Sequence, residues 1–428
     1  MLSELKVCHL NSGVHGGAAI AARRIHESLK LVGCRSKFFH LGTERMSADI
    51  EPLPGLAANS RTAALVDRLR VEWVRRRSRP SPEFDFYLLP WPGRRLPAQV
   101  SNSTEGATIL HLHWMQGWLT YRALPSKNVR VVLTLHDMNA FTGGCIYDWE
   151  CGRHVQGCGV CPQLMVRGSA DLSRRVAKQK TDFWRSVEVH VVAPSRWMLD
   201  QARRSAALEN AASFTHIPYG LDLDAFYPLP KAVARQALGL EEGIPTVLFG
   251  AASGTADRRK GYDLLVQALH LQRPDTAVRL LTFGHSEPRG ELPPSVQLIH
   301  LGQLSSDRLQ ALVYSAADVT VVPSLQDNSP QVILESLACG TPVLGTNVGG
   351  IPELISPGIT GGVASATSES LAVSLAELLL DRERLMTQGA SAREYVERNH
   401  TLERQGKAYR SLYADVLGAA HKLDKAAA

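Results

Sequence analysis

The apolar positions of the chain alternate between short continuous runs and stretches with the period of a helix. Short apolar runs bounded by turn residues are typical of strands buried on both faces of a parallel sheet, and helices then connect such strands. The pattern therefore predicts an α/β fold with parallel sheets. In the first half it predicts strands at 5–10, 36–42, 108–114, 129–137, 187–194 and 213–220, and helices at 19–33, 173–186 and 195–206.

A break in the pattern divides the chain. Residues 220–245 contain Pro228, Pro230 and Pro245 and no strand-like run, which indicates a linker with one short helix. Alternation then restarts, and 428 residues are more than one core usually supports. We predict two doubly wound domains, 1–220 and 221–404, with helices at 369–399 and 402–418 and the segment 405–428 packing back on the first domain. Strands are expected after the break at 246–253, 277–284, 296–303, 319–324 and 342–348, with helices at 261–272, 307–317 and 330–338.

Loops between a strand and the following helix are the places to look for a ligand site. Ligands of open parallel sheets bind at the carboxyl ends of the strands, so two such sheets are expected to face each other across a cleft. One such loop carries Gly16 and Gly17 ahead of a helix, where free amides attract phosphate. Another places Arg258, Arg259 and Lys260 before a helix. Three cations there oppose the helix dipole unless an anion binds or solvent screens them.

Two carboxylates stand out in the segment 322–345. Ser329 is a candidate N-cap and Pro330 suits the first helical position, which puts Asp327 just before the helix and Glu335 in its second turn. Helical side chains lean toward the N-terminus, so both carboxylates can face the end of the sheet. Glu335 stands among apolar residues, and a buried carboxylate needs partners. Ribose hydroxyls or groups of the protein itself could supply them.

With these motifs the chain resembles family 4 of the retaining glycosyltransferases, which have the two-domain GT-B architecture. The resemblance rests on Asp327 and Glu335 with seven residues between them, on the "SLACGTPVLGTNVGGIPE" that follows, and on "RRKG", "GG" and "LHD" in family order. It covers nearly the whole chain. The segments "HLHW" and "TGGC…GCGVCPQL" are similar to the bacterial exopolysaccharide branch, including enzymes of colanic-acid type. The chain departs from the family in having Asp327 where Glu is usual, and Gly250-Ala251 where "GR" is common.

The resemblance implies roles for the residues that match the motifs. Glu335 binds the ribose of a nucleotide-sugar donor and Asp327 the hydroxyls of the transferred sugar. Lys260 and Arg259 bind the diphosphate. The nucleobase lies against the backbone from Gly302 to Leu304.

In the first domain the resemblance gives the diphosphate contact to Gly16 and Gly17, and the donor-sugar contact near the reacting centre to His136. The leaving diphosphate is already activated, so positioned cations and amides can stabilise its charge, and catalysis requires no metal or other cofactor. The β-phosphate oxygen can take the proton of an acceptor hydroxyl that approaches from the same face. His136 then positions the donor sugar and supports its developing charge. A core histidine without such a role is the alternative.

Residues for the acceptor are sought at neighbouring strand ends of the first domain. His113, Trp114 and Trp118 follow one strand, and Asp137 follows the next beside His136. Aromatic faces stack on sugars, although the same residues could serve core packing alone.

Four cysteines follow His136 and Asp137 within one loop-like stretch. Cys145, Cys151, Cys158 and Cys161 have the spacing C-x5-C-x6-C-x2-C, in which the last pair has the two-residue gap familiar from zinc sites. A structural zinc, one or two disulfides, and free thiols remain open. Cys8, Cys34 and Cys339 are expected to be single buried thiols.

Composition and charge narrow the partners. A formal net charge of +6 is too weak over this length to indicate a nucleic-acid partner. No apolar run is long enough to span a membrane and no signal peptide is evident, so we expect a cytoplasmic protein. The segment 61–79 holds seven arginines with interleaved apolar residues. It is either a solvated helix face or an amphipathic helix that attaches to the inner face of the cytoplasmic membrane.

The leading prediction is a glycosyltransferase that uses a UDP-sugar or a GDP-sugar and extends an oligosaccharide or lipid-linked glycan of the bacterial cell surface, such as an exopolysaccharide or lipopolysaccharide. A transferase of sucrose-phosphate-synthase type with a soluble acceptor is one alternative. A nucleotide-sugar 2-epimerase and a non-catalytic nucleotide-sugar-binding protein are the others. The sequence identifies neither donor sugar, acceptor, linkage nor oligomeric state.

Overall fold

The computed structural model describes residues 5–53, 106–115, 129–165, 168–252, 254–273 and 277–426, and the single residues Leu69, Glu72 and Arg76. The rest of the basic segment 61–79 lies outside these residues, as does the acceptor candidate Trp118. The chain divides into two compact units, Met1–Pro218 with Gln405–Ala428, and Tyr219–Arg404.

The first unit is built on a parallel sheet, which among the described residues has seven strands in the order β3-β2-β1-β4-β5-β6-β7. Central strands are buried throughout, as β4 is, because helical crossovers leave no strand face open to water. The strands are β1 (Lys6–Asn11), β2 (Arg35–His40), β3 (Ile50–Pro52), β4 (Ile109–Leu112), β5 (Arg130–Thr134), β6 (Val189–Ala193) and β7 (Ser213–His216). The helices are α1 (Gly17–Leu31), α4 (Leu172–Arg185), α5 (Arg196–Arg204) and α12 (Leu402–Ala426), with short 3-10 turns at Asn139–Phe141, Arg153–Gln156 and Ala206–Leu208.

The second unit repeats this architecture with a parallel sheet of six described strands in the order β10-β9-β8-β11-β12-β13. The strands are β8 (Thr246–Gly250), β9 (Val278–Phe283), β10 (Val296–His300), β11 (Val319–Val322), β12 (Val343–Thr346) and β13 (Gly361–Ala364). The helices are α6 (Lys231–Ala237), α7 (Tyr262–His270), α8 (Asp307–Ala316), α9 (Gln331–Ala338), α10 (Ser368–Leu380) and α11 (Arg382–Asn399), with 3-10 turns at Gly254–Ala256, Arg258–Lys260 and Ile351–Glu353.

Chain order reverses at the same place in both sheets. The first strand of each unit lies between its second and fourth, so the switch falls between β1 and β4 in one sheet and between β8 and β11 in the other. Ligands of doubly wound sheets bind at this switch point, outside the carboxyl ends of the strands. The topology therefore directs attention to the loops after β1 and β4, and after β8 and β11.

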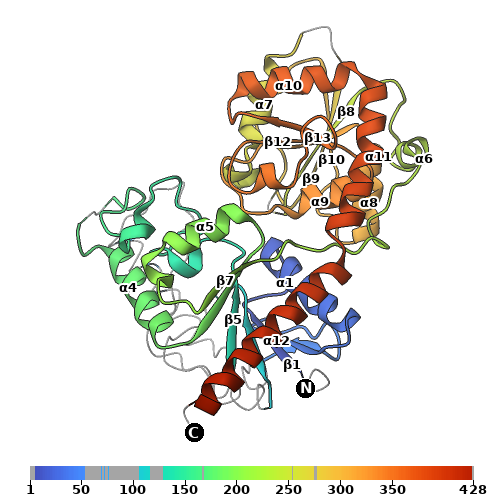
Figure 1. Cartoon of the computed structure of the whole chain (residues 1–428). Helices are drawn as coiled ribbons and strands as arrows, with labels where there is room; N and C mark the ends of the chain where they lie inside the picture. The colour runs from blue at the N-terminus through green and yellow to red at the C-terminus, as the bar shows by residue number, and fades with distance from the viewer. Residues whose placement is uncertain are drawn as a thin grey trace. The chain divides into compact units, whose positions relative to one another are not determined.

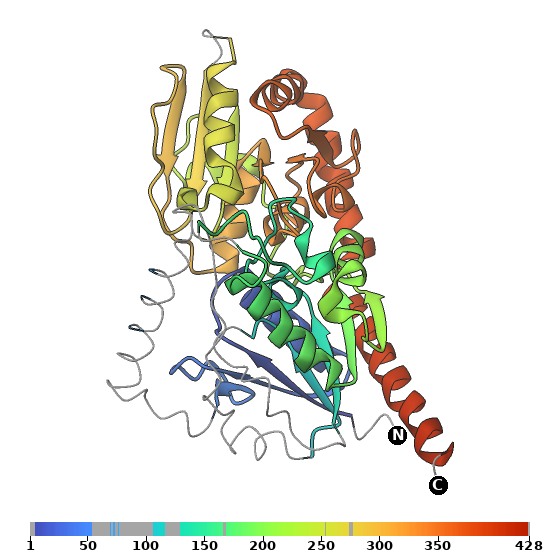
Figure 2. The same ribbon diagram turned by 90° about the vertical axis from the view of Figure 1, so that its left-hand side faces the viewer.

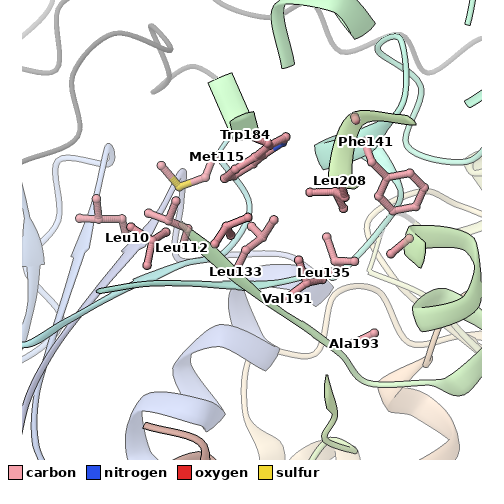
Figure 3. Close-up of a cluster of buried hydrophobic side chains, with 14 of the residues drawn as sticks. Leu10, Leu112, Met115, Leu133, Leu135, Phe141, Trp184, Val191, Ala193 and Leu208 are labelled. Carbon is pink, nitrogen blue, oxygen red and sulfur yellow. The ribbon is translucent and has the colours of Figure 1, made fainter. Parts of the chain in front are cut away.

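Each unit has its own hydrophobic core. In the first, Leu112, Leu133 and Val191 of three neighbouring strands pack with Trp184 of α4 and with Leu208 (Figure 3). The core of the second unit gathers side chains of β8, β9, β11, α7 and α10.

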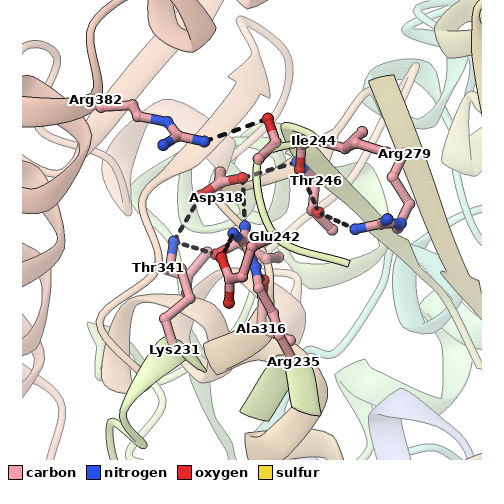
Figure 4. Close-up of polar contacts among 12 residues, drawn as sticks. Lys231, Arg235, Glu242, Ile244, Thr246, Arg279, Ala316, Asp318, Thr341 and Arg382 are labelled. Carbon is pink, nitrogen blue, oxygen red and sulfur yellow. Dashed lines mark hydrogen bonds and ion pairs between the residues drawn. The ribbon is translucent and has the colours of Figure 1, made fainter. Parts of the chain in front are cut away.

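A polar network secures the amino ends of the strands in the second unit (Figure 4). Asp318, just before β11, accepts from Arg235 at 2.7 Å, from the Thr246 amide at 2.8 Å and from Lys231 at 2.8 Å. Lys231 and Arg235 belong to α6, so the network ties this helix to the amino ends of the strands, which lie opposite the switch-point loops.

The final helix α12 completes the first unit. It lies beside the strands of that unit in both views (Figures 1 and 2). Its Tyr413 hydroxyl bonds His111 of β4 at 2.8 Å, and its Tyr409 hydroxyl bonds Thr134 of β5 at 2.9 Å. Both tyrosines are fully buried.

The structure departs from the predicted elements in three places. The strands β3 and β13 were not predicted, because β3 contains Pro52 and β13 begins with two glycines, so neither reads as an apolar run. The single helix predicted at 369–399 is divided into α10 and α11. The break falls at Asp381, whose carboxylate caps α11 by accepting from the Arg384 amide at 2.9 Å.

Candidate active site

The loop after β8 presents the cations of the second unit. Arg258 to Lys260 form a 3-10 turn capped by Asp257, which accepts from the Arg259 amide at 3.0 Å. Gly261 follows at φ 73°, and a Cβ there would lie 1.8 Å from the Pro323 carbonyl oxygen, so only glycine fits.

The neighbouring loop after β11 is fixed to this turn by hydrogen bonds. The Leu325 amide donates to the Arg259 carbonyl at 2.8 Å, and the Arg259 guanidinium donates to the Gln326 carbonyl at 3.2 Å. The two loops of the switch point therefore form one braced surface.

Asp327 joins the cations. Its carboxylate lies 2.7 Å from Nζ of Lys260 and 3.1 Å from Arg259, which also pairs with Asp257 at 2.9 Å. Burial alone would raise the pKa of Asp327, but Lys260 and Arg259 outweigh it and hold the pKa at about 2. The charge conflict expected at Arg258–Lys260 is thus relieved in part by carboxylates of the protein, and Asp327 is an ion-pair partner in this structure.

Glu335 lies on α9, 5% exposed, and accepts from the Tyr314 hydroxyl at 2.9 Å. The helix begins at Gln331 with Pro330 at its N-cap, one residue later than the predicted cap at Ser329. Tyr314 on α8 was missed by sequence reasoning, since it sits in an apolar helical pattern 21 residues away from Glu335 and nothing there signals a polar role.

The backbone predicted to face the nucleobase follows β10. Gly302 has φ 67°, and its carbonyl accepts from the Gly284 amide at 2.9 Å. The Leu304 carbonyl accepts from the side chain of Gln310 at 3.2 Å. Both contacts hold this stretch against the rest of the second unit.

In the first unit, the glycine loop after β1 leads into α1. Gly16 is the N-cap with φ 86°, and no side chain caps the helix. A Cβ on Gly16 or Gly17 would meet no atom within 4 Å, so no neighbouring group crowds the backbone at this helix start.

Asn11 at the end of β1 organises this switch point, and sequence reasoning missed it. Its buried side chain donates to the Gly13 carbonyl at 2.7 Å and accepts from the Trp114 amide at 2.9 Å. Ser12 bonds the Trp114 carbonyl through its amide at 2.8 Å and through its hydroxyl at 2.7 Å. Trp114 is thereby tied to the glycine loop through its backbone.

Buried histidines line the carboxyl ends of β1, β4 and β5. Nδ1 of His9 lies 2.8 Å from Nε2 of His113, and Nδ1 of His113 lies 3.0 Å from Nε2 of the partly exposed His136. Burial lowers the pKa of His136 to about 3, and burial together with the neighbouring histidines lowers the pKa values of His9 and His113 well below the usual value. These three hydrogen-bonded histidines, which we call the histidine chain, are therefore uncharged at neutral pH. Both ring nitrogens of His113 are engaged, so this residue can support His136 but has none left for an acceptor.

His9, His111 and His113 form the one group of described residues whose possible metal-ligand atoms lie within 4.8 Å of one another. Hydroxyls already satisfy His111, through Thr134 at 2.7 Å and Tyr413 at 2.8 Å. Burial lowers the pKa of His111 well below its usual value too. We interpret the group as a hydrogen-bonded network.

Asp137 turns the chain from β5 into the cysteine loop, which we define as residues 142–161. Its carboxylate accepts from the Asn139 amide at 2.8 Å, and the Asn139 side chain donates to the Gly144 carbonyl at 2.9 Å. Fully buried Lys180 of α4 donates to the carbonyls of Asn139 and Thr142, the latter at 2.9 Å, and its burial lowers its pKa to about 8.

All seven cysteines are free thiols, and Cys8, Cys34 and Cys339 are buried singly as predicted. Cys145, Cys151, Cys158 and Cys161 line one cavity of about 10 Å³. Burial raises the pKa of each of these four thiols, to about 11 at Cys158. Their sulfurs are not gathered as closely as the histidine nitrogens.

None of the helices in the described ranges combines the length and apolar character needed to cross a bilayer.

Comparison with known proteins relates the chain to sugar transferases. Residues 231–395 match the family model described as Glycosyl transferases group 1. A D-inositol 3-phosphate glycosyltransferase of Geodermatophilus obscurus is 32% identical over 369 residues, which cover 81% of this chain and 74% of that protein. One of Segniliparus rotundus is 26% identical over 352 residues, covering 79% of this chain and 71% of its own.

Solved structures agree on the architecture. Sucrose-phosphate synthase of Thermosynechococcus elongatus superposes with a TM-score of 0.69 at 22% identity, over 97% of this chain and 100% of that one. Anabaena HepE in complex with UDP-glucose gives 0.61 at 16% identity, over 97% and 100%. Such distant likeness establishes the fold, and it confirms the predicted pair of Rossmann-like domains of GT-B type.

Proposed function

Because this chain belongs to the group 1 glycosyltransferase family, we propose that it moves a sugar from a UDP-sugar, or alternatively a GDP-sugar, to a hydroxyl of an oligosaccharide or lipid-linked glycan, with retention of configuration. One observation carries the proposal. The switch point of the second unit brings Lys260, Arg259 and Asp327 together on two loops that are hydrogen-bonded to each other.

The donor binds the second unit in this proposal. Lys260 and Arg259 take the diphosphate, whose charge grows as the sugar leaves, and fixed cations stabilise that charge without reorganisation. Asp327 now holds these cations at 2.7 and 3.1 Å. When the diphosphate replaces it, its carboxylate becomes available to accept from hydroxyls of the sugar. Glu335, which accepts from the Tyr314 hydroxyl, also accepts from the ribose hydroxyls.

The first unit supplies neutral groups. Amides at Gly16 and Gly17 approach the diphosphate, and His136 hydrogen-bonds the donor sugar without carrying a charge. A neutral imidazole suits a positively charged, oxocarbenium-like centre better than an imidazolium would. The proton of the acceptor hydroxyl passes to the leaving β-phosphate, so no protein base and no catalytic metal are assigned.

UDP is preferred because HepE, a protein of the same fold, is known in complex with UDP-glucose. A donor screen that measures the nucleoside diphosphate released in the presence of a glycan acceptor tests both halves of the proposal. Release that depends on the acceptor supports transfer. Epimerised donor without release would identify an epimerase, and binding without either product would identify a non-catalytic binder.

A second acceptor class has its own support. The relatives are named for D-inositol 3-phosphate, and the superposing Thermosynechococcus enzyme for sucrose phosphate. Both names point to small phosphorylated acceptors. Adding inositol 3-phosphate and fructose 6-phosphate to the screen decides between this class and a glycan, because only the true acceptor accelerates release of the diphosphate.

Glu335→Ala tests the site itself. We expect transfer to fall by about 10²–10³-fold, because the ribose loses its carboxylate partner in a buried setting. Lys231→Met is the matched control, since it removes a charged pair of the same unit at the amino ends of the strands. Equal turnover by Glu335→Ala and the wild type would refute the assignment.

A further inference from the structure

We propose that the cysteine loop of the first unit holds one structural Zn²⁺ ion, bound by the sulfurs of Cys145, Cys151, Cys158 and Cys161. The four side chains line a single cavity of about 10 Å³, room for one water-sized centre, which suits an ion and excludes an organic ligand. The described cysteines form no disulfide with one another. Four thiolates around one centre are a common ligand set for structural zinc.

His154 gives an independent indication of a missing partner. Its ring is 1% exposed and lines the same cavity, and neither of its nitrogens has a hydrogen bond. The nearest carboxylate oxygen, on Asp148, lies 3.4 Å from Nδ1. A buried imidazole with two unsatisfied nitrogens is costly. Its place beside four thiols is explained if a cation fills the cavity and draws Asp148 and His154 together around it.

The backbone of the loop needs an external constraint. Among the described residues, the non-glycine residues with positive φ are Trp149, Glu150, Cys158 and Val160, all within this loop. Left-handed backbone costs non-glycine residues about 1–2 kcal/mol each and persists where surrounding structure enforces it. Four sulfurs bound to one ion provide such enforcement. The Gly143 amide, which donates to Sγ of Cys158 at 3.1 Å, orients one of them.

Charge balance favours an anionic centre at this place. Binding releases four thiol protons and leaves a tetrathiolate zinc with a net charge of −2. Lys180 is fully buried nearby and donates to the Asn139 and Thr142 carbonyls. A buried ammonium is expensive unless an anion compensates it, and the zinc centre supplies that anion.

Binding must tighten the loop. Zn–S bonds of about 2.3 Å in a tetrahedron place neighbouring sulfurs about 3.8 Å apart. The sulfurs now lie further apart than the histidine group does. Since Asp137 and Asn139 connect the loop to His136, the ion would brace the chain just beyond that residue.

Metal analysis of the full chain, purified with zinc and without chelator, is the direct test. We expect one zinc per chain in the wild type and in Cys34→Ser, a buried thiol of the same unit outside the loop, and none in Cys161→Ser. Since Cys161→Ser could fail to fold, the wild type is also loaded with Co²⁺, whose thiolate charge-transfer band reports sulfur ligation. Metal-free wild type, or a mass lower by two hydrogens per disulfide, would overturn the proposal. A cobalt spectrum of three sulfurs and one nitrogen would overturn the role of Cys151 in favour of His154.

A second inference concerns the direction of the histidine chain, and it rests on the function proposed for His136. Nε2 of His9 is buried without a hydrogen-bond partner. An unpaired buried N–H is rarer than an unpaired acceptor. We infer that Nε2 of His9 is the unprotonated atom. His9 then donates through Nδ1 to His113, and His113 donates through Nδ1 to His136.

This direction fixes the tautomer of His136. Its Nε2 accepts, so its proton resides on Nδ1. His9 and His113 are thus positioning residues. ¹⁵N NMR of histidine-labelled protein at pH 8 reads the tautomer without any substrate. We expect the Nδ1–H form for His136, with the Nε2–H form gaining population in His9→Phe. An Nε2–H form in the wild type would overturn the inference, and the glycosyltransferase proposal would stand unaffected.

Discussion

The switch points of the two units carry opposite kinds of polar cluster on the same topology. In the first unit the strand ends hold neutral histidines that satisfy one another and nearby hydroxyls. In the second they hold the formal charges of Lys260, Arg259 and Asp327. The carboxyl ends of the strands in the first unit therefore present directional hydrogen bonds. Those in the second unit present an electrostatic field suited to a diphosphate. A single fold provides both because the side chains at the strand ends, and not the sheet, decide the chemistry.

The two clusters should fail at different pH, and this is the largest effect we expect. The folded pKa values of His9, His111, His113 and His136 are lowered, so the unfolded chain binds more protons below pH 6.5. The histidine contribution to stability is complete above that pH. Below it, stability falls by about 1.4 kcal/mol per pH unit for each histidine, or about 5.5 kcal/mol per pH unit for the four. Urea unfolding between pH 7.5 and 5.5 measures this slope.

All seven tryptophans lie between residues 73 and 197, so their fluorescence follows the first unit alone. Loss of this signal should precede loss of the far-UV signal to which the second unit also contributes. His9→Phe should reduce the slope, and His270→Asn, at an exposed histidine of the second unit, is the control. If both units lost stability at the same pH, the predicted difference between the two clusters would be refuted.

The next largest effect should follow from removing a cation of the second unit. We expect Lys260→Ala to lower kcat by about 10²–10³-fold, about 3–4 kcal/mol, because it removes charge stabilisation from the leaving group. His9→Phe, which removes one neutral hydrogen bond distant from the charge, should cost less than tenfold. Steady-state kinetics at pH 8 compares them. Equal losses would mean that the neutral chain contributes as much as the charged cluster.

Acid should weaken the second cluster at a lower pH. The folded pKa of Asp327 is about 2 against a usual 3.8, so its contribution is complete above about pH 4 and is lost as pH falls toward 2. The shift corresponds to about 2 kcal/mol of stability. The difference in free energy of unfolding between wild type and Asp327→Asn should shrink across this window. A difference independent of pH would show that the ion pair adds nothing to stability.

The smallest effect tests the partner of Glu335. Tyr314→Phe removes one buried hydrogen bond, so the second unit should lose about 1 kcal/mol and UDP binding should weaken several-fold. Tyr395→Phe is the control, since its hydroxyl contacts the Glu353 carbonyl and Nε2 of His400, both at a longer 3.4 Å. Calorimetric titration with UDP separates the two variants. Unchanged binding by Tyr314→Phe would show that Glu335 needs no orientation.

The sequence predicted most of the fold because apolar runs and helical periods report burial directly. It missed β13 and the break at Asp381, where backbone pairing and a cap decide the structure and hydrophobicity is uninformative. It also placed Lys260 and Asp327 at the same end of one sheet, because both follow strands that meet at a switch point, and the structure has them 2.7 Å apart.

The sequence did not predict hydrogen-bond partners that come from distant segments of the chain. Tyr314 reaches Glu335, Asn11 holds Trp114, and Tyr413 reaches His111 only after the chain has folded. The neutrality of His113 is likewise a product of burial by several elements, none of which reads as polar in the sequence. Local sequence patterns identify candidate site residues, whereas tertiary packing determines which side chains hydrogen-bond to them.

Because Tyr409 and Tyr413 close the first unit from beyond residue 400, the order of synthesis and the order of folding cannot coincide. Ribosomes release domains from the N-terminus onward at about 5–20 residues per second, so the first sheet waits roughly 10–40 s for the helix that covers it. The second unit, continuous in sequence, is free to fold during that interval. A nascent chain halted before Tyr409 would therefore carry a folded second unit attached to an unfinished first unit.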